Sequence, residues 1–397
     1  MSKSPLPPIA ILFLTIFIDL LGFGIVLPLL PNYAKELGAE PLVIGVAVAG
    51  FSLMQFFFAP VWGGISDRIG RRPVILISVA TSVISYLIFS QANSIWLLLV
   101  SRLLAGIGSA NISTTQAYIT DITDASNRSR SLGIIGAAFG LGFVFGPPVG
   151  GFLKTYYGMQ SVGYLAVGLT SLDLVLAYFF LPESLKEKKA ETAFKFFRFE
   201  KFSEAMQNPA IARLFVINFL FTLGFVNMQV SASLLGKEHF AMTEETIGYG
   251  FALIGVLSVI VQGGLIGVLA RKFGERRLQA AGCLLMAAGL TLIPFSPDLR
   301  VAAVAVSLLA IGNGLTTPVN TALVSIYTSQ PLQGEMLGLS QSVGSLARIA
   351  GPFSGSLLYG LDYHAPYLMA GAVLLLATLL SISLLGADLT PEPSPQS

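Results

Sequence analysis

The sequence has 397 residues, of which 54% are hydrophobic and only 11% are charged, and its formal net charge is +2. Because water-soluble proteins carry about 25% charged residues, this composition excludes an ordinary soluble domain and predicts an integral membrane protein. The small net charge argues against nucleic acid as a partner. The single cysteine, Cys283, excludes an intramolecular disulfide and a cysteine-based metal site.

A helix needs about 20 apolar residues to cross a bilayer, and the sequence contains twelve such runs. They cover residues 8–30, 42–62, 73–91, 95–120, 131–153, 161–181, 211–233, 245–270, 278–296, 301–327, 335–360 and 366–386. The first run is longer than the hydrophobic region of a signal peptide, so we interpret it as a transmembrane helix. The predicted fold is an all-α membrane protein with twelve transmembrane helices.

Basic residues predict the orientation of these spans. With the N-terminus in the cytoplasm, the inner segments hold most of the lysines and arginines, and the outer loops hold only Lys35, Lys154, Lys237 and Arg300. Because cytoplasmic loops carry an excess of basic residues, we expect both termini to be cytoplasmic. The expected location is a bacterial inner (plasma) membrane.

The longest polar segment, 182–209, separates the sixth span from the seventh. We interpret it as a cytoplasmic linker between an N-terminal six-helix bundle, 1–181, and a C-terminal six-helix bundle, 210–390, with a short tail at 391–397. Within the linker, Phe199, Phe202 and Met206 share a helical face, which weakly favours an interfacial amphipathic helix. A solvated tether explains the segment equally well.

The two halves contain related segments at an offset of 205 residues. From Ala117 the chain reads AYITDITDASNRSRSLGIIG, and from Ala322 it reads ALVSIYTSQPLQGEMLGLSQ; GPPVGG from Gly146 aligns with GPFSGS from Gly351. Six spans in each half bring both copies into the membrane from the same side, which predicts a parallel repeat with a cavity between the bundles at mid-depth. This arrangement favours transport.

The loop between the second and third spans reads GGISDRIGRRP from Gly63, and a weaker copy, GVLARKFGERR, occupies residues 267–277. This pattern resembles the signature of the major facilitator superfamily, and the resemblance implies an inner-side latch that favours the outward-open state. The latch residues would be Gly63, Gly64, Asp67, Arg68, Gly70, Arg71 and Arg72. The glycines permit a tight turn, and Asp67 can lie at the positive N-terminus of a neighbouring helix. An ordinary positive-inside loop is the alternative.

The fifth span carries GLGFVFGPPVGG, residues 140–151, which resembles the antiporter signature of drug/proton exchangers in that superfamily. The matching positions are Gly142, Gly146, Pro147, Gly150 and Gly151. Glycines four residues apart let helices pack closely, whereas the prolines remove backbone donors and bend the helix. A span that is merely packed through small residues is the alternative, since GPFSG in the eleventh span shares part of the pattern.

In the fourth span, a set of residues recurs at spacings that place them on one helical face. They are Arg102, Gly106, Ser109, Ser113 and Gln116. This pattern, with AYITDIT from Ala117 and GFGIVLPLLP from Gly22, resembles the tetracycline/proton antiporters and their relatives in the drug/proton antiporter group. Tetracycline exporters carry acids in spans three and nine and a histidine in span eight. None of these occurs in the apolar cores here, which argues against tetracycline as the substrate.

Asp19 is the only ionisable residue in the stretch 13–30. An aspartate at mid-membrane costs about 2.5 to 3.5 kcal/mol on insertion scales, so we interpret Asp19 as the proton-coupling acid, with Arg102 at comparable depth. A structural hydrogen-bonding acid is the alternative. Asp173, in the sixth span, is the only other acid within a membrane core, and a structural or lipid-boundary role competes evenly with a coupling role.

Polar stripes in other spans predict a substrate cavity. The candidate residues are Phe23, Gln55, Ser109, Ser113, Gln116, Asn218, Thr222, Gln229, Gln262, Asn313, Thr317, Asn320, Gln341 and Arg348. Buried amides without partners are costly, so a water-filled cavity explains them together, although an interhelical hydrogen bond explains any single amide equally well. Arg348 indicates either an acid partner or an anionic substrate.

Several sequence features are missing. His239 and His364 lie in or beside outer loops without companions at metal-ligand spacing, so we expect no metal and no other cofactor. No GxxxxGK[ST] loop for ATP phosphates occurs, so energy would come from a gradient. No catalytic constellation with solvent access suggests an enzyme.

The leading hypothesis is proton-coupled efflux of amphipathic organic compounds by alternating access. The expected partners are a small organic substrate, protons and membrane lipid, and we expect a monomer. The alternatives are uniport or symport of a specific metabolite, such as an organic anion or a sugar, and a non-transporting membrane receptor or scaffold.

Overall fold

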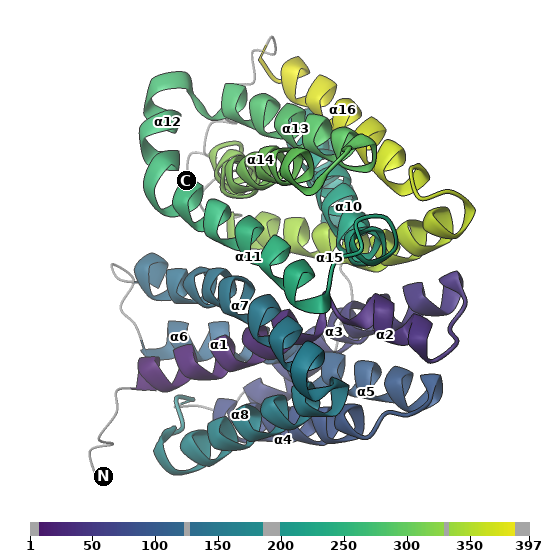
Figure 1. Ribbon diagram of the computed structural model, residues 1–397. Coiled ribbons are helices and arrows are strands. Elements are labelled where there is room, and N and C mark those ends of the chain that lie inside the picture. The colour runs from purple at the N-terminus through teal and green to yellow at the C-terminus, as the bar shows by residue number, and fades with distance from the viewer. Residues whose placement is uncertain (1–7, 123–127, 186–198, 329–332, 386–397) are drawn as a thin grey trace, which may run out of the picture. The chain divides into compact units, whose positions relative to one another are not determined.

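A computed structural model describes residues 8–122, 128–185, 199–328 and 333–385 (Figure 1). These residues are almost entirely helical and include no β-strand, so the predicted all-α fold is confirmed. The chain divides into two compact units, one formed by residues 1–196 and 242–252 and the other by residues 197–241 and 253–397. The sequence-based limits of the two bundles and the linker stay predictions.

The first unit contains the helices of the N-terminal half. They are α1 (Pro8–Val26), α2 (Leu30–Glu36), α3 (Pro41–Ile69), α4 (Arg71–Ser90), α5 (Ile95–Gly108), the short 3₁₀ turn η1 (Ser109–Asn111), α6 (Ile112–Ile122), α7 (Arg128–Tyr157) and α8 (Met159–Phe180). The start of α11 also belongs to this unit.

The remaining helices follow in the second half of the chain. They are α9 (Phe199–Gln207), α10 (Pro209–Glu238), α11 (Glu244–Ile260), the π-helical segment η2 (Val261–Leu265), α12 (Ile266–Phe273), α13 (Glu275–Leu292), the 3₁₀ turn η3 (Ile293–Phe295), α14 (Leu299–Ile326), α15 (Gln333–Leu361) and α16 (Ala365–Ser383). Helix α9 lies within the segment for which the sequence leaves an interfacial amphipathic helix and a solvated tether open. The ring of Phe202 stacks on Phe215 of α10 at a centroid distance of 6.3 Å.

Each of the twelve predicted runs coincides with a helix or an interrupted helix of the described chain. Eight of these helices are long and apolar enough to cross a membrane, and the pair Ala10–Val26 and Leu30–Glu36, bent by 47°, makes a ninth. The multi-pass membrane architecture predicted from hydropathy is therefore supported by the helices themselves.

Helix α1 packs on α6, α7 and α8 of the first unit. Its side chains Ile11 and Ile16 belong to a buried cluster with Ile75 of α4 and Tyr118 of α6. Helix α7 runs beside α1 (Figure 1), and its glycines allow the two backbones to touch.

The glycines of the predicted antiporter motif form this contact. A Cβ on Gly142 would lie 2.9 Å from the carbonyl carbon of Leu20, and one on Gly146 would lie 2.7 Å from that of Gly24. Gly150 faces Ile25 in the same way. The close helix packing expected from this spacing is confirmed, and it holds the segment of α1 that directly follows Asp19.

Two other positions of the motif, Pro147 and Gly151, contact the start of α11 within the same unit. The carbonyl oxygen of Pro147 lies against Gly248, and Gly151 lies against the backbone of Glu244. Helix α7 continues through Pro147 and Pro148.

Candidate functional site

Asp19 lies in the middle of α1 and is only 6% exposed. Its carboxylate accepts a hydrogen bond from the side-chain amide of Asn111, with 3.0 Å between Nδ2 and Oδ2. Asn111 ends the 3₁₀ turn η1 and is fully buried. Among the described residues, no lysine, arginine or histidine forms an ion pair with Asp19.

A second acid lies on the neighbouring helix α8. Thr15, one turn before Asp19 on α1, donates a hydrogen bond from Oγ1 to Oδ1 of Asp173 at 2.8 Å. Asp173 is 1% exposed, and its Oδ2 has no hydrogen-bond partner within the described part of the chain. The two carboxyl groups also interact electrostatically. A lipid-boundary role for Asp173 is therefore wrong, because its side chain points into the protein.

Arg102 of α5 is buried without an ionic partner in the described residues. Its guanidinium lies over the rings of Phe51 and Phe89, at 5.7 and 5.8 Å from their centroids. Its Nε and Nη2 have no hydrogen-bond acceptor there. Arg102 does not pair directly with Asp19, although both interact electrostatically with the buried Tyr86 hydroxyl of α4.

Tyr86 reaches this position because α1 has a glycine opposite it. A Cβ on Gly22 would lie 2.9 Å from Cζ of Tyr86, so any larger residue would displace the ring. We call the resulting group of buried side chains the polar cluster of the first unit. It consists of Thr15, Asp19, Tyr86, Arg102, Asn111 and Asp173.

The predicted polar face of the fourth span is only partly correct. Arg102 and Ser109 are buried, but Gln116 is exposed, and the side chain of Ser113 lies outside the described residues. The reason is the 3₁₀ turn, which has about 3.0 rather than 3.6 residues per turn and interrupts the helix between Gly108 and Ile112.

The 3₁₀ turn also explains why sequence analysis missed Asn111. On an ideal α-helix, a residue nine positions after Arg102 points to the opposite side. The one available signal was that Asn111 is the only asparagine in the fourth span. Tyr86 could not be recognised from the sequence either, because its position depends on the absence of a side chain at Gly22 of another helix.

Other predicted cavity residues of the first unit lie next to the polar cluster. The rings of Phe23 and Phe51 are 4.8 Å apart, so Phe51 bridges Phe23 and Arg102. Gln55 donates a hydrogen bond from Nε2 to the carbonyl oxygen of Ser109 at 3.1 Å. Gln55 therefore makes the interhelical bond that the sequence left as an alternative to substrate contact.

The second unit brings together polar residues of α10 and α15. Asn218 donates to the carbonyl oxygen of Ser340 at 2.7 Å, and Arg348 donates from Nη2 to Oγ of Ser345 at 2.8 Å. Thr222 donates to Asn218 Oδ1 at 3.5 Å. No carboxylate in the described part of the chain pairs with Arg348, so the acid partner considered from the sequence is not found there.

The remaining candidates are not joined by one network. Thr317 donates to Asn313 at 3.4 Å, whereas Asn320 is buried and its Oδ1 has no partner among the described residues. Gln229 is buried in α10. Gln262, in the π-helical segment, and Gln341 are both exposed.

The predicted latch forms a charge network around Arg71. Its guanidinium contacts Asp67 at 2.7 Å and Asp121 of α6 at 3.3 Å. Arg68 is exposed, Gly63 accepts a hydrogen bond from Ser66, and Gly64 is half-buried. Arg72 donates to the carbonyl oxygen of Tyr178 at 2.6 Å.

Glu183, which sequence analysis did not select, occupies the positive end of α4. Its carboxylate accepts hydrogen bonds from the backbone N–H groups of Arg71, at 2.9 Å, and Arg72, at 3.2 Å. Gly70 has a φ of +115° and packs against this carboxylate, so a side chain there would clash. Within the first unit, the acid at this helix N-terminus is thus Glu183, while Asp67 pairs with Arg71.

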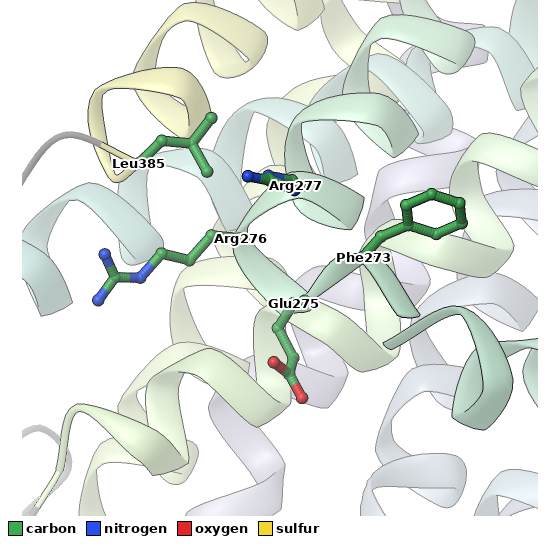
Figure 2. Close-up of a pocket in the computed structure, with 6 residues that line it drawn as sticks. Phe273, Glu275, Arg276, Arg277 and Leu385 are labelled. Carbon is green, nitrogen blue, oxygen red and sulfur yellow. The ribbon is translucent and has the colours of Figure 1, made fainter. Parts of the chain in front are cut away.

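The weaker motif copy in the second unit borders a cavity of about 280 Å³ (Figure 2). The cavity is lined by Phe273, Gly274, Glu275, Arg276, Arg277 and Leu385. Arg276 donates to the carbonyl oxygen of Leu384 at 3.0 Å and lies over the ring of Tyr327. This cavity includes none of the predicted substrate-cavity residues.

Among the described residues, no group of three histidine, cysteine, aspartate or glutamate side chains could hold a metal ion. His239 and His364 instead flank the ring of Tyr363, at centroid distances of 5.1 and 3.9 Å.

The family model described as Major Facilitator Superfamily matches residues 12–263 and 214–397. Tetracycline resistance protein, class C, from Escherichia coli is 33% identical over 352 residues, which cover 87% of this chain and 88% of the relative. Multidrug resistance protein 2 from Bacillus subtilis (strain 168) is 29% identical over 371 residues, 92% of each chain. The crystal structure of the human organic anion transporter MFSD10 (TETRAN) is similar with a TM-score of 0.69 and 26% identity, covering 95% of this chain and 100% of that one.

Proposed function

Because the chain belongs to the major facilitator superfamily, whose members are multi-pass membrane transporters of small organic substrates and not enzymes, we propose that it exports amphipathic organic compounds in exchange for protons. The predicted resemblance to the drug/proton antiporter group is confirmed by the tetracycline and multidrug resistance relatives. The exchange mechanism described below is our proposal for this chain.

The burial of Asp19 without a cationic partner carries the proposal. A charged side chain at the centre of a membrane is costly and is found where it serves a site or a pathway. Asp19 is held by one amide donor, and the carboxyl of Asp173 lies near enough to interact with it. One proton bound to this pair removes the repulsion between the two acids and reduces the cost of their burial.

In the proposed cycle, Asp19 takes a proton when it is accessible from outside and releases it inside, where substrate binds. Alternating access couples the two events, because each occupant stabilises a different state of the transporter. Arg102 supplies two buried nitrogens, Nε and Nη2, that have no acceptor among the described residues. Its guanidinium lies over the ring of Phe51, which in turn packs against Phe23. This arrangement suits a substrate with both apolar and polar parts.

The test uses purified protein in liposomes, with a pH gradient and ethidium as the amphipathic probe. Replacing Asp19→Asn keeps the shape of the side chain and its ability to accept a hydrogen bond, but it cannot carry the proton. We expect pH-driven accumulation to be lost, while exchange of ethidium against ethidium is partly retained. Asp362→Asn is the matched control, because it makes the same chemical change at an exposed acid of the outer loop.

An unaltered pH-driven flux in Asp19→Asn would rule out its role in coupling. Asp173→Asn ranks second, and we expect weaker coupling rather than its loss, because Asp173 bonds to Thr15 and influences Asp19 electrostatically.

We further propose that the protein is a monomer in a bacterial inner membrane with both termini in the cytoplasm. The distribution of basic residues supports this orientation. In this orientation the network of Asp67, Arg71 and Asp121 lies on the inner side, where breaking and re-forming of its ion pairs would accompany the conformational cycle.

A second candidate function is export of organic anions. Arg348 is bonded to Ser345 and pairs with no carboxylate in the described chain, so an anionic substrate would supply the missing charge. The solved structure of MFSD10 is described as that of an organic anion transporter, which adds support.

This second function predicts a difference between two probes. Arg348→Gln should reduce transport of the amphipathic anion 8-anilinonaphthalene sulfonate and spare ethidium, whereas Arg348→Lys should retain part of the anion flux because it keeps the charge. Equal effects on both probes would contradict an anion-binding role.

A further inference from the structure

The side-chain amide of Asn111 is only half paired in its contact with Asp19, and the protonation state of Asp19 decides whether the other half can pair. Asn111 uses Nδ2 to donate to Asp19, but its Oδ1 is buried and has no partner within the described residues. An ionised carboxylate can only accept hydrogen bonds, and an amide oxygen also only accepts. The amide oxygen of Asn111 and the charged form of Asp19 therefore cannot bond to each other.

A proton on Asp19 changes this relationship. The neutral carboxylic acid has one O–H donor, which can donate to Oδ1 of Asn111 while Nδ2 continues to donate to the other carboxyl oxygen. The acid and the amide then form a closed pair with two hydrogen bonds. Among the described residues, the buried oxygen of Asn111, which is costly to leave unpaired, can gain a partner from Asp19 only when that acid is protonated.

The surroundings provide few other partners for that proton. From α8, Asp173 accepts from Thr15 through Oδ1, and its Oδ2, which has no partner among the described residues, is the one competing acceptor of the neighbouring acid. From α4, the Tyr86 hydroxyl lies against Gly22, one turn from Asp19. Arg102 of α5 can only donate, so it cannot receive the proton. Helix α7 contributes glycine backbone next to Leu20 and no described ionisable side chain at this level.

From this geometry we infer that Asn111 is a positioning residue for the proton of Asp19, accepting the O–H bond of the protonated acid through its amide oxygen. This inference rests on the proposed proton exchange and adds the group that holds the proton during the cycle. The 3₁₀ turn is part of the device, because it directs Asn111 toward α1. Asn111 does not itself gain or lose a proton.

Infrared difference spectra between acid and alkaline forms of the protein in lipid test the inference. The band of the protonated carboxyl is assigned to Asp19 by its disappearance in Asp19→Asn. In the wild type, the band should lie at the position of a hydrogen-bonded acid, and in Asn111→Leu it should move to higher wavenumber because both bonds are lost. A wild-type band at the position of an unbonded acid would overturn the inference without any Asn111 variant.

The Asn111→Asp variant provides a second readout. Two carboxyl groups within hydrogen-bonding distance share one proton, because they cannot easily both be charged. The pH at half-maximal proton-linked ethidium flux should therefore rise by more than about one unit. Thr115→Val is the matched control. Thr115 is buried one turn after Asn111, and among the described residues its hydroxyl bonds to the backbone carbonyl of Asn111 and not to its side chain, so neither readout should change.

The outcomes separate this inference from the proposed function. If Asp19→Asn abolishes both the band and coupled flux, while folded Asn111 variants leave the band and the pH midpoint unchanged, only the inference fails. If Asp19→Asn leaves coupled flux intact, the proposed exchange itself fails.

Discussion

Thr15 on α1 donates a hydrogen bond to Asp173 on α8 at 2.8 Å, one helical turn away from Asp19. Because Thr15 and Asp19 both lie on α1, this bond links Asp173 to the helix that carries the other acid of the polar cluster. Thr15 is fully buried, so its hydroxyl has no access to solvent as a substitute partner.

Replacing Thr15→Val keeps the shape of the side chain and removes the donor. Asp173 then loses its one hydrogen bond in the described chain. We expect the free energy of unfolding to fall by about 1 to 3 kcal/mol, as for other buried polar groups that lose their partners. Thermal unfolding of the protein in detergent measures the effect. Thr15→Ser is the control that keeps the hydroxyl, and equal melting temperatures for the two variants would contradict the role of this bond.

The packing of α7 on α1 predicts intolerance to a single methyl group. In Gly146→Ala the new Cβ would lie 2.7 Å from the backbone of Gly24, so the helices must separate. Overpacking typically costs about 1 to 3 kcal/mol, and we expect lower stability together with reduced transport. Gly168→Ala serves as the control, since nothing lies within 4 Å of its Cβ position. Wild-type stability in Gly146→Ala would show that the contact is looser than described.

Glu183 should stabilise the start of α4 through two distinct effects. The N–H groups of Arg71 and Arg72 bond to different oxygens of Glu183, so Glu183→Gln keeps an acceptor for only one of them and removes the charge. Charge at a helix N-terminus contributes about 0.3 to 1 kcal/mol. Glu183→Ala removes the charge and both acceptors, and it should lower the free energy of unfolding further, by up to about 2 kcal/mol. Melting temperatures in the order wild type, glutamine, alanine are expected, and any other order contradicts this capping role.

The contact between Asp362 and His364, which lies outside the spans, predicts that stability depends on pH. The backbone N–H of His364 and then its ring hold the pKa of the Asp362 carboxyl below its usual value. The aspartate pKa in the unfolded chain is about 3.9. The stabilisation from this contact is therefore fully present above that pH and is lost as the pH falls through the lower pKa of the folded protein.

A carbon-13 NMR titration with labelled aspartate, assigned with Asp362→Asn, measures this pKa directly. In His364→Ala the pKa should rise only partly, because the backbone N–H remains. A full return to the ordinary value would mean that the ring, and not the backbone, is the main cause.

Hydropathy was sufficient to predict where the helices lie in the chain. The run 42–62 begins one residue after the start of α3 (Pro41–Ile69) but stops seven residues before its end. The difference arises because polar residues such as Asp67 and Arg68 continue the helix beyond the apolar stretch. The glycine spacing in α7 predicted close packing but could not name α1 as its partner, since that depends on the three-dimensional arrangement.

The site was predicted less completely for identifiable physical reasons. Asp19 and Asp173 stand out because a charge in an apolar run is rare. Asn111 was missed because the interpretation assumed a regular α-helix where a 3₁₀ turn changes the direction of the side chains. Glu183 was missed because it follows α8, far in sequence from the loop whose helix it caps.

The release of protons on binding of ethidium to purified, unbuffered protein tests the central claim most directly, because it requires no assumption about flux. The account predicts that the wild type releases protons at a pH where Asp19 is partly protonated, and that Asp19→Asn releases fewer or none while still binding the probe. Equal proton release from both proteins would contradict proton exchange at Asp19.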